Sequence, residues 1–294
     1  MKLAVASAIA AAAIAGPAFA RSGPEVEIRH AVARVAVVVE DRSDIAVEIQ
    51  QGTSGLPSLR VTRDGDDVRI DGGLGTRGFM NRGDGIRNCS SRSSNPDQPG
   101  EGVTVEVRNV GRVNVSDAPL IVIRTPRNVN VGASGAVYGS VGRGATSVDL
   151  GNGGCGSWNV ANTEGPVSLS IGGSGDMRAG TSTALDISIG GSGSITAGST
   201  RDLDVSIGGS GDVVVARVDG PADVSIAGSG DVDIRDGNSP DLSISIAGSG
   251  DVNFGGVAGD VDISMVGGGD VTVARATGAV SRSIMGGGDI HIGN

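Results

Sequence analysis

A short segment recurs along the second half of the chain, and this recurrence constrains the fold more than any other feature. Seven eight-residue segments align without gaps, the first being residues 170–177 (SIGGSGDM) and the last beginning at Ser283. Weaker copies precede them near residues 131–135 and 150–154. Such a period is typical of solenoid and other repeat folds. The apolar residue that follows the first serine of each copy is Ile171, Ile189, Ile207, Ile226, Ile246, Met265 or Ile284, so the step is 18 to 20 residues.

Within each repeat, apolar and polar residues alternate. Leu203, Val205 and Ile207 are separated by Asp204 and Ser206. A period of two residues indicates a strand that is buried on one face. A helix is excluded here because glycine and β-branched residues dominate and no apolar stripe with a period of 3.6 residues appears.

A repeat of about 19 residues cannot bury its own apolar face, whereas stacked repeats can. We therefore predict an all-β fold, a parallel β-helix (β-solenoid) with coils of about 19 residues spaced by about 4.8 Å. Equivalent residues then form columns along the axis. The column that contains Ile171 is predicted to point inward. The direction of the neighbouring column, which runs from Gly172 to Met285, stays open at this point.

The glycine content is consistent with this architecture and excludes others. The chain has 294 residues, of which 52 are Gly but only three are Phe, one Tyr and one Trp. Collagen is excluded because the glycines do not fall at every third position. A simple disordered linker is excluded because 38% of the residues are hydrophobic.

Two positions in each repeat are always glycine. We interpret them as structural corner positions that require either a positive φ or a close approach of the backbone. The clearest members of these two columns are Gly173, Gly175, Gly209, Gly211, Gly228, Gly230, Gly248 and Gly250.

Residues 1–20 have the pattern of a secretory signal peptide. Lys2 provides the positive start, a short apolar stretch follows, and Ala18, Phe19 and Ala20 form an A-x-A cleavage site. An uncleaved anchor is the alternative. The apolar stretch is shorter than the roughly 20 residues of a membrane span, so we expect no transmembrane segment after cleavage. The protein is thus predicted to be exported, either to the periplasm or to the cell surface and medium.

The charge balance bears on the partners. Without Lys2 the chain has 22 Arg and 33 acidic residues, which gives 22 − 33 = −11. A nucleic acid is therefore not expected as a partner, because its phosphates would be repelled.

The remaining chain divides into two parts on composition. We predict an irregular β region at residues 21–101, made of early coils or a cap and a long loop, and a β-solenoid at residues 102–294. A separate small β-domain at the N-terminal side is the alternative. Cys89 and Cys155 are candidates for a disulfide because an oxidising compartment is expected. Two buried thiols are the other interpretation.

The repeated unit resembles the head GIN domain family of auto-transporter adhesins, most clearly between Ser206 and Val252. The resemblance covers residues 100–294 well and 21–99 more loosely. It implies an exported bacterial protein with a right-handed, single-stranded β-helix, similar in shape to pectate lyases, and no known catalytic site. Because the given chain ends within a repeat, without a membrane barrel, we do not carry over the auto-transporter part of the name.

An aspartate follows the second invariant glycine in most repeats, at positions 176, 212, 231, 251, 270 and 289. Carboxylates about 4.8 Å apart repel each other by roughly 1 kcal/mol in water, so something must offset the repulsion. We favour hydrogen bonds from backbone N–H groups at the corner. Bound Ca²⁺ is the alternative, with Asp212, Asp231 and Asp251 as candidate ligands. The spacing differs from that of the calcium-binding nonapeptide repeat.

No catalytic or cofactor-binding residue is predicted. Most acidic residues of the repeats occupy repeated positions, which indicates structure, and His30 and His291 match no motif. We therefore expect a non-enzymatic protein that binds an unidentified glycan or protein of the envelope or cell surface, with the serine columns forming a regular polar face. The alternatives are a polysaccharide lyase or hydrolase, which requires a non-repeated cluster of charged residues in a groove, and a calcium-dependent scaffold.

Overall fold

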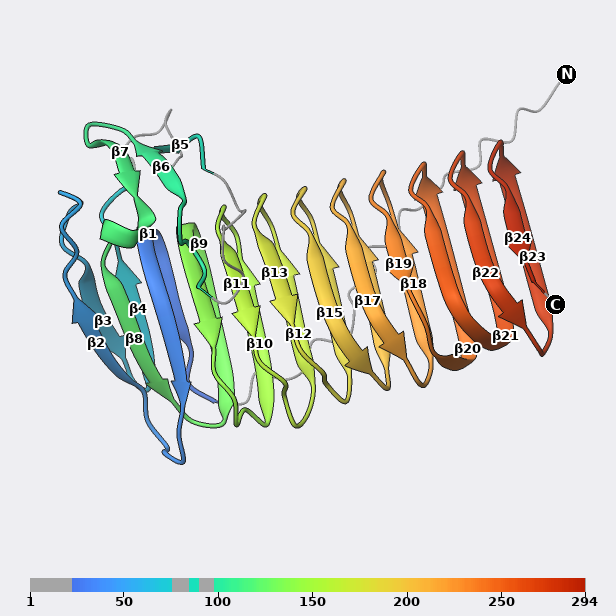
Figure 1. Cartoon of the computed structure of the whole chain (residues 1–294), viewed down its shortest axis with the longest axis horizontal. Coiled ribbons are helices and arrows are strands. Elements are labelled where there is room, and N and C mark those ends of the chain that lie inside the picture. The colour runs from blue at the N-terminus through green and yellow to red at the C-terminus, as the bar shows by residue number, and fades with distance from the viewer. Residues whose placement is uncertain (1–22, 76–84, 90–97, 294) are drawn as a thin grey trace, which may run out of the picture.

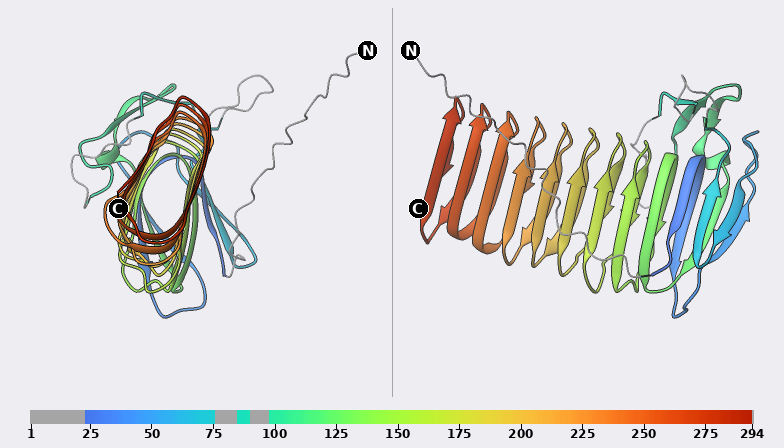
Figure 2. Two further views of the ribbon diagram at one scale, coloured as in Figure 1. Left: turned by 90° about the vertical axis from the view of Figure 1, so that its right-hand side faces the viewer. Right: turned by 180° about the vertical axis from the view of Figure 1, so that it is seen from behind.

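The computed structural model describes residues 23–75, 85–89 and 98–293. The predicted signal peptide lies outside the described residues. Within these ranges the chain forms strands and one short 3-10 helix, and most strands stack side by side along the long axis of the molecule (Figure 1). Seen along that axis, the coils superimpose as a flattened ring (Figure 2). The predicted β-solenoid is confirmed.

The repeats supply the regular part of the stack. Each coil contributes two strand segments, and each segment pairs in parallel with its equivalent in the next coil. Strand β21 is continuous and supplies one segment to each of two coils. The strands of this part are β10 (Ser147–Asn152), β11 (Ser157–Val160), β12 (Val167–Ile171), β13 (Asp176–Ala179), β14 (Leu185–Ile189), β15 (Ile195–Thr200), β16 (Leu203–Ile207), β17 (Val213–Val218), β18 (Ala222–Ile226), β19 (Val232–Ile234), β20 (Asn238–Gly248), β21 (Val252–Gly267), β22 (Val271–Ala276), β23 (Val280–Gly286) and β24 (Ile290–Ile292).

The alternating residues bury one face of every strand. In β16, Leu203, Val205 and Ile207 are buried, while Asp204 and Ser206 point outward. The column from Ile171 to Met265 is fully buried, as predicted. Its last member, Ile284 of β23, is 46% exposed because no described coil covers it. The neighbouring column, from Gly172 to Met285, points outward, with Met285 72% exposed.

The N-terminal end of the stack does not follow chain order. Its strands are β1 (Val26–Val39), β2 (Ala46–Gln50), β3 (Arg60–Asp64), β4 (Asp67–Asp71), β8 (Leu120–Thr125) and β9 (Asn128–Val141). Strand β1 pairs in parallel with β9 on one side, and with β4 and β8 on the other. Strands β2 and β3 then pair antiparallel with β8 and β4. These antiparallel strands close this end of the solenoid, at the blue end of Figure 2.

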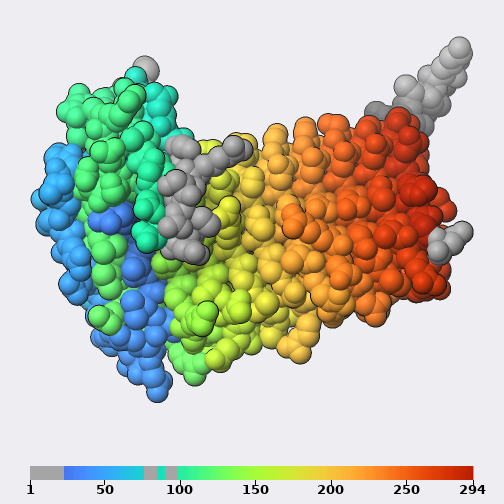
Figure 3. Space-filling view, in the orientation of Figure 1, coloured from blue at the N-terminus to red at the C-terminus, as the bar shows by residue number. Residues whose placement is uncertain are grey.

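A small sheet is inserted between β4 and β8 and stands beside the first coils, in teal and green in Figure 3. It contains β5 (Ile86–Arg87), β6 (Thr104–Val107) and β7 (Gly111–Asn114), followed by the 3-10 helix η1 (Val115–Asp117). Val105, Val113 and Val115 pack with Tyr138 of β9 in a second core, separate from the core of the solenoid.

The described strands before β8 are divided between the stack and the inserted sheet. Strands β1 and β4 pair within the stack, whereas β5, β6 and β7 form the inserted sheet. The alternation of valines in β6 indicates a strand buried on one face, and it does not distinguish a strand of the solenoid from one of the inserted sheet.

The invariant glycines are explained by close approach of the coils. A Cβ on Gly191 would lie 1.9 Å from the carbonyl oxygen of Gly173, and one on Gly193 would lie 1.9 Å from that of Gly175. The same clash recurs in both columns up to Gly286 and Gly288. Close approach is therefore the general reason for these glycines.

Candidate functional site

One broad face of the solenoid carries a column of serine hydroxyls. It is formed by the outward positions of β12, β14, β16, β18, β20, the second half of β21, and β23. These side chains are exposed, except that of Ser225, which is half-buried. We call this surface the polar face. Its serine column consists of Ser170, Ser188, Ser206, Ser225, Ser245, Ser264 and Ser283.

A second outward column on the polar face mixes carboxylates and hydroxyls. Partial burial, together with the charges of Asp204 and Asp149, raises the pKa of Asp186. Partial burial and the charges of Asp223 and Asp202 likewise raise the pKa of Asp204, and burial raises the pKa of Asp223. The column consists of Asp149, Ser168, Asp186, Asp204, Asp223, Ser243, Asp262 and Ser281.

The corner aspartates bind the backbone of the next coil. The backbone N–H of Asp251 donates to Oδ1 of Asp231 at 2.9 Å, and that of Asp231 donates to Oδ1 of Asp212 at 3.3 Å. The same bond links the later members, with Asp270 donating to Asp251 at 2.8 Å and Asp289 to Asp270 at 2.9 Å. These hydrogen bonds offset the repulsion between the carboxylates, as the favoured interpretation required.

The calcium candidates Asp212, Asp231 and Asp251 thus use one carboxylate oxygen in a backbone hydrogen bond. Among the described residues, no three His, Cys, Asp or Glu side chains come together in a group that could hold a metal ion. Ca²⁺ binds six to eight oxygens, so one aspartate per coil would leave most of the ligands to be supplied by other groups.

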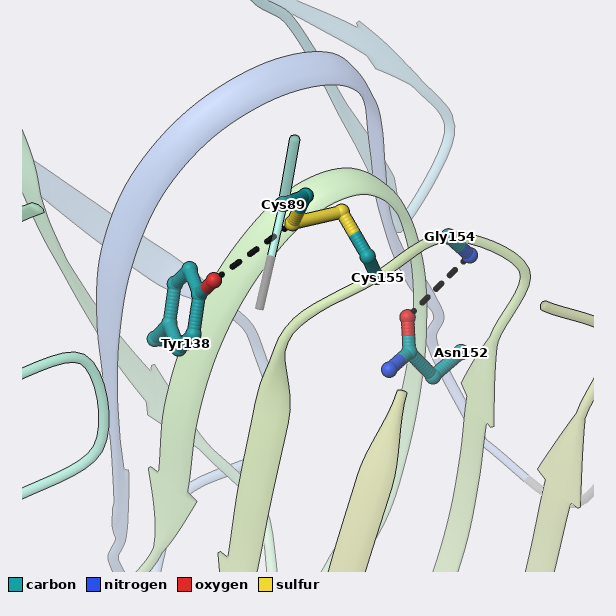
Figure 4. The surroundings of a disulfide bond; sticks show 5 residues. All are labelled: Cys89, Tyr138, Asn152, Gly154 and Cys155. Carbon is teal, nitrogen blue, oxygen red and sulfur yellow. Dashed lines mark hydrogen bonds between the residues drawn. A yellow bond between two sulfur atoms is a disulfide. The ribbon is translucent and has the colours of Figure 1, made fainter. Parts of the chain in front are cut away.

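Cys89 and Cys155 form a disulfide that ties the inserted sheet to the solenoid (Figure 4). The hydroxyl of Tyr138 lies 3.5 Å from Sγ of Cys89, as the dashed line in Figure 4 shows. Burial raises the pKa of Tyr138 far above its usual value. The phenol is therefore neutral at physiological pH.

The polar face is hollowed at its N-terminal end by a groove of about 470 Å³. Its floor includes Gly132 of β9 and Gly151 of β10, and Ser170 of β12 lies on one side. The opposite side carries Glu25 and, from β1, Glu27, Arg29 and His30. This is a non-repeated cluster of charged residues.

Two arginines hold the carboxylate of Glu27 on the groove. Nε of Arg69 donates to Oε2 of Glu27 at 3.0 Å, and Nε of Arg29 donates to Oε1. Burial of Glu27 opposes ionisation, but the hydrogen bonds and charges of these two arginines outweigh it and lower the pKa of the carboxyl. Glu27 is therefore a fixed hydrogen-bond acceptor at neutral pH.

His30 lies where the pairing of β1 with β9 shifts register, between Ile28 and Ala31. Its φ of +48° lies in the left-handed region, which is uncommon for residues other than glycine. Nδ1 of His30 is 3.9 Å from Oδ2 of Asp71. The bulge turns this side chain toward the rim of the groove instead of leaving it in a regular strand.

Sequence reasoning assigned no role to Glu25, Glu27, Arg29 or His30, and it treated His30 and His291 as ordinary surface or strand residues. The structure places His30 on the groove and His291 in β24, at the other end of the stack. The sequence contains one indirect indication of the groove. Positions 132 and 151 align with the serine column but carry glycine.

Comparison with known proteins supports the resemblance drawn from the repeats. Residues 220–294 match the family model described as "Putative auto-transporter adhesin, head GIN domain". The matched segment spans the C-terminal coils, from β18 onward. A search of curated proteins gave no match. In the part of the chain that the structure describes, no helix is long and apolar enough to cross a membrane.

Proposed function

We propose that this protein is an exported, non-enzymatic β-solenoid that binds a glycan or protein of the cell envelope or surface through its polar face. The observation that carries the proposal is the serine column, in which one hydroxyl projects from each of seven successive coils. The adhesin name of the matched family points the same way.

A face of this kind suits a ligand that is itself repetitive or extended. Each hydroxyl offers one donor and two acceptor lone pairs, and a single exposed contact of this type contributes little. Several contacts at a regular spacing act together, because after the first contact the others form at a high effective concentration. The negative charge of the chain disfavours nucleic acids as the ligand.

The test is a binding screen with purified protein against glycans and isolated envelope components. The variant Ser188→Arg/Ser206→Arg/Ser225→Arg obstructs the polar face with three long side chains at outward positions. Its control is Thr196→Arg/Val214→Arg/Asn253→Arg, which adds the same three charges on outward positions of β15, β17 and β21, on another face. Loss of binding in the first variant alone supports the proposal, and equal binding by both variants contradicts it.

The groove favours one alternative function, a polysaccharide-active enzyme. The observation behind it is the non-repeated cluster of Glu25, Glu27, Arg29 and His30. Hydrolysis requires a carboxylic acid that can protonate the leaving oxygen, whereas Glu27 is held ionised by Arg29 and Arg69. Release of reducing ends or of unsaturated sugars from envelope polysaccharides would establish the enzyme. Binding without turnover is the outcome that we expect.

A further inference from the structure

The groove forms where glycines stand in place of residues with side chains. The fold accommodates such side chains at the equivalent positions of other coils. Glu27, Gly132, Gly151 and Ser170 occupy one outward column on successive strands. From Ser170 onward every coil has serine at this position. The groove is the point in the column where two successive coils carry no side chain.

The next outward column also has glycine at the groove and larger residues in later coils. Gly153 and Gly172 line the groove, and the residues that follow Gly172 in its column grow to Ala227, Ala247, Val266 and Met285. The fold therefore tolerates side chains at both columns in later coils of the same molecule.

Steric conflict does not demand glycine at the groove. A Cβ on Gly132 would meet Oε1 of Glu25 at 3.6 Å, and one on Gly151 would meet Oγ of Ser170 at 3.5 Å. Both distances are ordinary van der Waals contacts, in contrast to the 1.9 Å clash at Gly191. Glycine in a strand weakens it, and it often marks a place where a ligand comes close to the backbone.

We infer that this groove is a binding site for a neutral saccharide unit, which lies on the exposed backbone of Gly132 and Gly151 between Glu27 and Ser170. The inference deepens the proposed function and rests on it, since it names the ligand class of one part of the polar face. The volume of about 470 Å³ falls within the range of small-molecule sites, roughly 300–1,000 Å³.

The hydrogen-bonding groups of the groove select for hydroxyls. Glu27 only accepts, Arg29 only donates, and Ser170 does both. A sugar hydroxyl donates and accepts, so it satisfies all three kinds of group. A free cation such as an ammonium ion only donates and would meet Arg29 as a like charge, and an anion would meet the fixed carboxylate of Glu27. The Cα–H groups of the floor offer a shallow apolar surface to the ring.

The experiment tests whether larger side chains placed in the groove weaken saccharide binding. Purified protein is screened on an array of neutral, amino and acidic oligosaccharides, and its affinity for the best ligand is measured by calorimetry. We expect the wild-type protein to select neutral oligosaccharides, and Gly132→Gln/Gly151→Gln to weaken binding by about tenfold or more. Gly132→Ser/Gly151→Ser introduces the serine that later coils carry in this column, so the fold already accommodates it. This variant should obstruct the groove less than the glutamine variant does.

The matched control is Gly268→Gln/Gly287→Gln. These glycines lie in the turns that follow β21 and β23, outside the polar face, and a Cβ on either would have no atom within 4 Å. A melting midpoint equal to that of the wild type shows that each variant is folded. The control should bind as the wild type does.

The outcomes separate this inference from the proposed function. If envelope material binds but the groove variants bind it as well as the control does, the groove inference is wrong and the proposed function stands. Selection of amino or acidic sugars in preference to neutral ones also overturns the inference. If the wild-type protein binds neither a saccharide nor any envelope component, the proposed function itself fails.

Discussion

A Cβ on Gly209 would lie 2.0 Å from the carbonyl oxygen of Gly191 in the preceding coil, whereas the nearest atom to a Cβ on the neighbouring Gly208 would be 3.9 Å away. Two adjacent glycines in one turn are thus present for different reasons. Gly209 allows two coils to approach each other, while Gly208 belongs to a column that carries alanine at Ala227 and Ala247.

The two glycines should therefore respond in opposite ways to the same substitution. Gly209→Ala should lower the free energy of unfolding by about 1–3 kcal/mol, because the coil spacing must open locally. Gly208→Ala should be neutral or stabilising by about 0.5 kcal/mol, because alanine reduces the entropy lost on folding. Chemical denaturation of both variants provides the comparison. Equal destabilisation would show that close approach is not what requires glycine.

The last described coil carries a charge in a core column. Arg282 of β23 lies over Ile263 of β21, which is fully buried. In the part of the chain that the structure describes, β23 pairs with a strand on one side only, and Val280 and Ile284 are exposed beside Arg282. A charge at an inward position protects an edge strand against pairing with another chain.

Replacing this charge should expose the edge to self-association. We expect Arg282→Ile to form dimers or larger species at concentrations at which the wild-type protein does not, as measured by light scattering over a dilution series. Ser281→Ile, which adds the same side chain at the neighbouring outward position, is the control. An Arg282→Ile variant that scatters like the wild type would show that Arg282 has no protective role.

The disulfide should stabilise the inserted sheet. Cys89 and Cys155 are separated by 66 residues, and closing a loop of that length stabilises a folded chain by up to about 4 kcal/mol on entropic grounds. We expect Cys89→Ser/Cys155→Ser to make the inserted sheet sensitive to protease first, because that sheet is attached through a small separate core. Limited proteolysis followed by mass spectrometry locates the cuts. Cleavage that begins in the repeats would contradict this expectation.

The carboxylate column predicts an unusual pH dependence. The pKa values of Asp186, Asp204 and Asp223 are raised in the folded state by burial, and for the first two also by neighbouring carboxylates. A raised folded pKa means that the folded state binds more protons than the unfolded state near that pKa. This contribution therefore increases stability as the pH falls toward it.

Asp204→Asn should test this directly. Near pH 7 the variant should be more stable than the wild type, by less than about 1 kcal/mol because the side chain is partly solvated. The advantage should shrink as the pH is lowered toward the raised pKa. Asp262→Asn is the control, since Asp262 lies between Ser243 and Ser281 in the same column. Melting curves at several pH values measure the difference, and a gain that does not change with pH would rule out a charge effect.

Removal of calcium should leave the protein unchanged. Oδ1 of Asp231 and Oδ1 of Asp251 already accept hydrogen bonds from the backbone of the next coil. We therefore expect the same melting midpoint with added Ca²⁺ and with a chelator. A bound ion would stabilise the folded state by mass action. A higher melting midpoint in Ca²⁺ would therefore support the alternative of a calcium-dependent scaffold.

The regular coils could be predicted from sequence because their repeat also sets their register. Once Ile171 and Ile189 are equated, the inward column, the two glycine columns and the corner aspartates follow, since every coil repeats the same positions. Strand alternation then decides which side chains are buried. To predict the hydrogen bonds of the aspartates, it was enough to assume that the coils stack in parallel.

The groove could not be predicted in this way, because its two sides are far apart in the chain and only one belongs to the repeats. Glu27 faces Gly132 because β1 inserts between β9 and the pair β4 and β8. Strand β1 has no repeat motif, and a strand without one pairs equally well in many registers when only its alternation is known. The register shift at His30 adds a local irregularity that alternation does not encode.

The amino-acid sequence by itself therefore determined the coil, its inward face and the spacing of its columns, because these depend on local alternation and on a repeat that aligns with itself. Only the tertiary structure decided which strands cap the stack, which partner β1 takes, and that Glu27, Gly132 and Ser170 share one surface. Those contacts are set by packing between segments of unrelated sequence, and packing is resolved only when the whole stack is assembled.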